Sequence, residues 1–91
     1  MTREDIQKGK IIYYARINTR VGIYDLCELK IRTVEDTYFV GTDKRDKHAY
    51  PLSYSSLNKY VFDDRKVCLS VLNEAEKNAP KIKSEINYEE Y

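Results

Sequence analysis

Residues 23–35 have the sequence IYDLCELKIRTVE, and this stretch decides the fold class. Apolar and charged side chains alternate along most of it, which is the two-residue period of a β-strand. The apolar row is Ile23, Cys27, Leu29 and Ile31, and the charged row is Glu28, Lys30 and Arg32. Such alternation is typical of an antiparallel sheet with one face in water. We therefore expect a long strand over residues 23–35.

The preceding apolar segment, residues 11–17 (IIYYARI), has the same period. One row is expected to face the core and consists of Ile11, Tyr13, Ala15 and Ile17. Tyr14 and Arg16 fall on the other row, which is expected to lie outside or at the mouth of a barrel. Residues 18–22 (NTRVG) contain turn residues and are expected to join the two strands as a loop.

Three shorter strands are expected after the long one. The first covers residues 38–42 (YFVGT), where Gly41 is a site for a bulge. Residues 43–48 (DKRDKH) form a charged hairpin tip, and residues 49–54 (AYPLSY) form the next strand. Because Pro51 has no N–H to donate, that strand is expected at an edge of the sheet. A helical turn at 55–58 then leads to a brief strand at 59–62.

A helix is expected from about Asp64 to Asn78, with Asp63 as N-cap and Pro80 as the residue that stops it. Its apolar stripe is Val67, Cys68, Val71, Leu72 and Ala75, while Leu69 lies off that stripe. Five strands with a helical turn before the last one, followed by a helix, predict a mostly β (α+β) fold. The architecture expected is a five-stranded SH3-like small barrel over residues 1–80, with an acidic, Tyr-containing tail at 81–91. One core is expected, made of Ile11, Tyr13, Ile17, Cys27, Leu29, Ile31, Val40, Val71 and Leu72.

Nothing in the sequence predicts an enzyme, a cofactor or a metal site. His48 is the only histidine and falls in the charged tip, and the glycines do not form a phosphate-binding loop. Cys27 and Cys68 lie in apolar patterns, so both are expected to be reduced, buried and unreactive. The N-terminus is charged and no apolar run approaches a membrane span, so we expect a cytoplasmic protein without membrane contact.

Tyrosine enrichment is the most unusual feature of the composition, with nine Tyr against two Phe and no Trp. Tyr suits small barrels, and it also supplies rigid anchors for binding other proteins. Tyr14, Tyr54 and Tyr60 are further possible anchors. The candidate partner-binding residues are Arg20, Tyr24, Lys44, Arg45, Lys47, Tyr50, Glu85, Tyr88, Glu89, Glu90 and Tyr91.

The body of the chain is mildly basic and the tail acidic, since residues 84–91 hold three acids and no Lys or Arg. Protein binding is therefore one functional class and nucleic-acid binding by a basic, Tyr-bearing surface is the alternative. Acidic residues interleave with the basic ones, which favours the first class. The charged tip can equally be a solubilising hairpin, and the tail can equally be disordered.

The run IYYARINTRVGIYDLCELKIRTVEDTYFVGTDKRDKHAYPLSY, followed by VFDDRKVCLSVLNEAEKNAP, resembles small proteins encoded by phages and mobile elements of Gram-positive bacteria. The resemblance covers residues 12–80 and carries over no functional residue. It implies an accessory protein that binds a host protein or protein complex in the host cytoplasm. Inhibitors of host defence, anti-CRISPR proteins among them, are prominent in this class.

Overall fold

The computed structural model describes residues 1–78, which form one antiparallel sheet and one helix. The strands are β1 (Ile11–Asn18), β2 (Ile23–Val34), β3 (Tyr38–Asp43), β4 (Ala49–Ser53) and β5 (Val61–Phe62), and the helix is α1 (Arg65–Lys77). The sheet order is β4-β3-β2-β1-β5. The fold is therefore mostly β with a C-terminal helix, as the sequence predicts. The sheet is open, however, and the closed barrel expected from the sequence is not observed.

Most element boundaries lie within two residues of the prediction. Residues 1–78 also contain two short 3₁₀ turns, η1 (Arg3–Asp5) and η2 (Tyr54–Ser56), and the sequence did not predict η1. The N-cap of α1 is Asp64 and not Asp63, because the Asp64 side chain accepts a hydrogen bond from the Lys66 backbone N–H. Pro51 does lie in an edge strand, β4.

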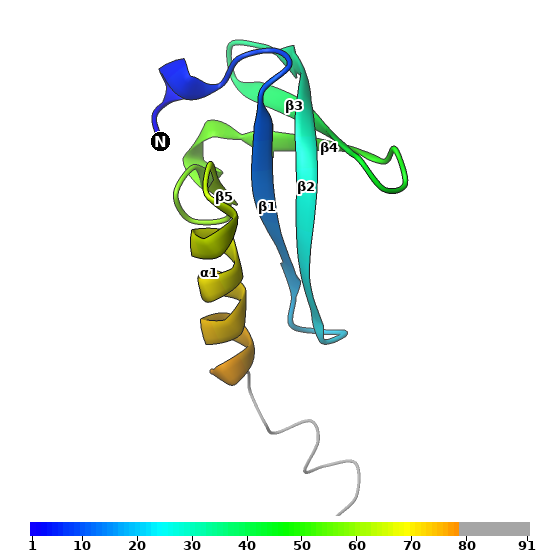
Figure 1. Cartoon of the computed structure of the whole chain (residues 1–91), viewed down its shortest axis with the longest axis vertical. Helices are drawn as coiled ribbons and strands as arrows, with labels where there is room; N and C mark the ends of the chain where they lie inside the picture. The colour runs from blue at the N-terminus through cyan, green and yellow to red at the C-terminus, as the bar shows by residue number, and fades with distance from the viewer. Residues whose placement is uncertain (79–91) are drawn as a thin grey trace, which may run out of the picture.

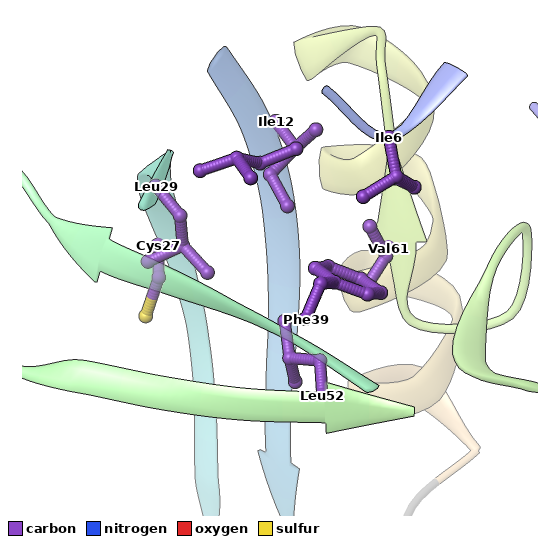
Figure 2. Packing of buried hydrophobic residues seen from close by; sticks show 8 residues of the cluster. Ile6, Ile12, Cys27, Leu29, Phe39, Leu52 and Val61 are labelled. Carbon is purple, nitrogen blue, oxygen red and sulfur yellow. The ribbon is translucent and has the colours of Figure 1, made fainter. Parts of the chain in front are cut away.

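Strands β1 and β2 form a two-stranded ribbon, and β3 and β4 cross over one of its faces (Figure 1). The first core lies between these layers, and Figure 2 shows its side chains converging from both. Its buried members are Ile6, Ile12, Cys27, Leu29, Ile31, Phe39, Leu52 and Val61. Tyr14 packs against this core, although the sequence placed it on the outside.

The second core lies on the opposite face of the ribbon, which α1 covers. Ala15, Phe62, Cys68 and Leu72 are its buried members, with Tyr13, Ile17, Tyr24, Leu26 and Val71 packed around them. The single core predicted from sequence is therefore wrong. Tyr14 is directly opposite Cys27 and Ala15 is opposite Leu26, so the two predicted apolar rows lie on opposite faces of the ribbon. Both faces are covered, and the two rows contribute to different cores. The predicted core residue Ile11 is half-buried and belongs to neither core.

Strand β3 approaches β2 closely at Gly41, which pairs with Ile31. A Cβ at this position would lie 2.9 Å from the Leu29 side chain, so no larger residue fits without a shift. The irregularity expected at Gly41 is found on the partner strand, where the register shifts between Ile31 and Thr33. The alternation of β3 also buries Phe39, leaving the predicted core residue Val40 half-buried.

Candidate binding site

The turn between β3 and β4 carries the charged residues that the sequence analysis favoured, and a buried carboxylate organises it. Asp43 is 1% exposed and accepts a hydrogen bond from the Arg45 backbone N–H at 2.7 Å. Burial alone would raise the pKa of Asp43, but the bonds from the Arg45 backbone and guanidinium outweigh it and the pKa lies below its usual value. Asp43 is therefore held as a carboxylate that fixes the turn.

The basic side chains of this turn are largely used within the chain. The Arg45 guanidinium lies 3.2 Å from an Asp25 oxygen and 3.5 Å from Asp43 Oδ2, and hydrogen bonds to these two carboxylates raise the pKa of Arg45. Lys44 Nζ lies 3.0 Å from Glu28 Oε2. Lys47 is exposed, adopts a positive φ of 64° and makes no ion pair within residues 1–78. Two of the three predicted basic contacts are thus already neutralised by acids of β2 and β3.

Tyr50 begins an aromatic row beside this turn. Its ring centroid lies 4.7 Å from that of His48 and 5.5 Å from that of Tyr14, which comes from β1. Burial is the main cause that raises the pKa of both tyrosines above the usual value. Tyr14 and Tyr50 both pack against the first core, so the row joins β4 to β1 there and Tyr50 is a structural contact.

The remaining predicted residues lie elsewhere. Arg20 is in the β1–β2 turn, where its backbone N–H bonds Asn18 Oδ1 at 3.1 Å, and Tyr24 packs in the second core. Figure 1 places that turn well away from the β3–β4 turn, so the two loops do not form one surface. The tail candidates, Glu85, Tyr88, Glu89, Glu90 and Tyr91, lie outside the described residues.

A groove of about 280 Å³ opens between β1 and β4, next to η2. It is lined by Tyr14, Ala15, Ile17, Pro51, Leu52, Ser53, Ser56 and Tyr60. Most of these side chains are apolar or aromatic, and Tyr60 is 47% exposed. Ser56 Oγ donates to the Ser53 carbonyl at 2.6 Å, which holds one rim of the groove in place. Sequence reasoning named Tyr14 and Tyr60 as possible anchors, but the groove joins residues over 40 positions apart and no local pattern reveals it.

The groove runs beside backbone that lacks a strand partner. The Ala15 N–H donates to the Tyr60 carbonyl at 2.7 Å, and beyond this bond β1 pairs only with β2 among the described residues. Because alternate residues of a strand point the same way, the N–H of Ile17 faces the same outer edge as that of Ala15. The groove thus combines walls of mixed polarity with a short, unpaired strand edge.

Both cysteines are fully buried and free, and burial raises the pKa of each thiol to about 11. No three His, Cys, Asp or Glu side chains within residues 1–78 are arranged to hold a metal ion. In the same part of the chain, α1 is too short and too polar to cross a bilayer.

Comparison with models of protein families, with curated proteins and with solved structures gives no match to this chain.

Proposed function

We propose that this protein is a non-enzymatic binding protein that takes an extended segment of a partner protein into the groove between β1 and β4. The observation that carries the proposal is the open sheet, which leaves a groove with aromatic, aliphatic and hydroxyl-bearing walls beside the unpaired outer edge of β1. An extended segment can add to such an edge through main-chain hydrogen bonds, while pockets receive its alternate side chains. The segment we propose has apolar or aromatic residues at alternate positions.

The chemistry of the two rims supports addition at β1 and not at β4. The β1 rim offers the backbone of Ile17, whereas the β4 rim contains Pro51, which has no N–H to donate. Tyr60 lies at the same opening and is 47% exposed, so its ring can contact a bound side chain. Half-buried Tyr residues are common anchors in protein interfaces.

The wider biological proposal follows from the sequence resemblance. We propose that this protein is an accessory protein of a phage or mobile element and that it binds a host protein in the host cytoplasm. Inhibition of host defence, such as anti-CRISPR activity, is one function of this kind. A variant SH3-like barrel also remains a proposal, supported by the strand order and by the 3₁₀ turn η2 before β5. The nucleic-acid alternative is weakened at the β3–β4 turn, where Lys44 and Arg45 are paired with acids.

The test is selection of linear peptides from a random display library on the purified full chain, with counter-selection on the Tyr60→Ala variant. We expect enriched peptides to shift the amide resonances of Ile17 and Tyr60 and to lose at least about ten-fold in affinity in Tyr60→Ala. Tyr38→Ala is the matched control, because Tyr38 is 42% exposed and does not line the groove. Equal binding to the wild type and Tyr60→Ala, or equal loss in both variants, would overturn the proposal.

Affinity capture from host lysate with and without nuclease then tests the class of partner. A captured protein that survives nuclease, and that the enriched peptides displace, supports the groove. Recovery of nucleic acid alone would contradict protein binding.

A further inference from the structure

The groove between β1 and β4 lies close to the point where α1 ends. Ile17 lines the groove and also belongs to the second core, which contains Leu72 of α1. Figure 1 shows α1 beside the lower half of β1, and the two elements are in contact. The helix ends at Lys77, which is about 8 Å beyond Leu72 at a rise of about 1.5 Å per residue. About six extended residues cover about 20 Å, which is enough to return from that point to the groove.

The sequence that follows the helix has the pattern that we propose for a groove ligand. Residues 79–91 lie outside the described part of the chain. Within them, residues 81–88 have the sequence KIKSEINY. One row of its two-residue period is Ile82, Ser84, Ile86 and Tyr88, and the other row is entirely polar.

We infer that the groove receives residues 81–88 of its own chain, and that this segment competes there with the partner protein. This competition presupposes the proposed function, because both segments use the same strand edge and the same walls. The partner must therefore displace the 81–88 segment, which excludes sequences that bind more weakly than the segment does.

The groove offers both kinds of contact that strand addition requires. The outer edge of β1 at Ile17 has no strand partner within residues 1–78, so its N–H is available to a carbonyl of the added segment. Tyr60 is 47% exposed at the same opening, so its ring can pack on an apolar side chain of the segment. The volume of about 280 Å³ is below the usual range of about 300–1,000 Å³ for small-ligand pockets, which suits a few side chains of an added strand.

The charges around the groove also favour this segment. None of the residues that line the groove is charged. Burial raises the pKa of Tyr14 in the groove wall, and the positive charge of Arg16 opposes that rise, so Arg16 acts on this wall. Lys59 directly precedes Tyr60, is exposed and takes part in no ion pair within residues 1–78. The end of the chain carries the opposite charge on Glu85, Glu89 and Glu90.

The covalent link makes even weak contacts sufficient. A segment joined to its site by a short stretch of chain has an effective concentration in the millimolar range. An intrinsic affinity of about 1 mM would then fill the groove for a substantial fraction of the time. A free partner at micromolar concentration needs a far higher affinity to compete, so occupancy by the 81–88 segment sets a threshold for binding.

The first test compares amide resonances of the full chain with those of Ile86→Asn/Tyr88→Asn, without any added ligand. We expect Ile17 and Tyr60 to shift in the variant, while Phe39 in the first core stays unchanged. Lys83→Gln/Asn87→Ser is the matched control, because it alters the polar row of the same segment and should leave Ile17 and Tyr60 in place. Unshifted resonances in the first variant, or equal shifts in both variants, would overturn the inference.

Dilution distinguishes the chain's own segment from that of a second copy. The resonances of Ile17 and Tyr60 in the wild type should not depend on protein concentration, because occupancy within one chain does not. A return to the positions of Ile86→Asn/Tyr88→Asn on dilution would overturn occupancy within one chain and would identify the segment of a second copy as the occupant.

The second test measures competition with peptides selected on the groove. Their affinity should rise at least about five-fold in Ile86→Asn/Tyr88→Asn, because a larger fraction of the groove is open. A synthetic peptide of residues 81–91 should bind this variant and weaken at least about five-fold when Tyr60→Ala is added. Equal affinity of the selected peptides for wild type and variant, with Tyr60→Ala still weakening them, would overturn the inference and leave the proposed function intact. Failure of every peptide to bind either chain would overturn both.

Discussion

The two faces of the β1–β2 ribbon are covered in different ways. The first core contains Ile6, which follows η1, and side chains from all five strands. Most of these side chains are completely buried. The second core depends on one helix, of which only Cys68 and Leu72 are buried. The strands therefore form the body of the domain, whereas α1 is held against it by few side chains.

The largest effect should come from Phe39→Ala in the first core. Phe39 is 0% exposed and contacts Tyr54, with ring centroids 5.3 Å apart, so its removal leaves a cavity among packed neighbours. We expect a loss of about 3–5 kcal/mol in the free energy of unfolding, measured by urea denaturation. A loss below that of Leu72→Ala would contradict the ranking of the two cores.

Leu72→Ala should cost about 2–4 kcal/mol, because Leu72 is the largest buried side chain of α1. Its effect should also be more local. Hydrogen exchange should accelerate along α1 and leave the amides of Leu29 and Phe39 protected. Exchange that accelerates equally in both regions would show that the domain has a single cooperative core.

Asp43→Asn should cost about 1–3 kcal/mol near neutral pH, because it weakens the charge-assisted bonds to Arg45 beside the first core. Since the pKa of Asp43 is lowered in the folded state, its stabilisation is present above the unfolded value of 3.8 and is lost as the pH falls through the folded value. Urea melts at several pH values should therefore show the wild-type and Asp43→Asn stabilities converging below pH 3.8. Parallel curves would count against this role of Asp43.

The smallest effect concerns the cysteines, one in each core. Both should resist a thiol reagent under native conditions, because each is buried and has a pKa raised to about 11. If α1 opens before the sheet does, Cys68 should react several-fold faster than Cys27 when single-cysteine variants are compared. Equal rates would indicate that both thiols are exposed only by global unfolding.

Local sequence patterns predicted most of the elements, because strand alternation, the Pro51 edge position and the helix stripe are local properties. The patterns did not predict that there are two cores, because period-two alternation does not determine which row of one strand lies on the same face as which row of the next strand. For residues 11–17 the choice depended on the register that places Tyr14 opposite Cys27. The open sheet was equally hidden, since closure depends on the curvature of strands far apart in the chain.

The candidate sites were harder to predict for a similar reason. Lys44 and Arg45 looked available in a charged run, but their partners Glu28 and Asp25 come from another strand. The dense basic run of the β3–β4 turn is therefore largely neutralised by acids from another strand. The β1–β4 groove was equally hidden, because it joins Tyr14 to Pro51 and Tyr60, which lie far apart along the chain.

Pro51 has a consequence for how the molecule behaves in a crowded solution. An open sheet exposes strand edges, and such edges are the usual starting points for filaments and amyloid-like aggregates. A second copy of this chain could extend the sheet beyond β4 only by pairing with this strand. Pro51 lies in the middle of this short strand and has no N–H to donate to such a pairing. The same proline that leaves the groove open on one rim therefore protects the protein against self-association through that edge.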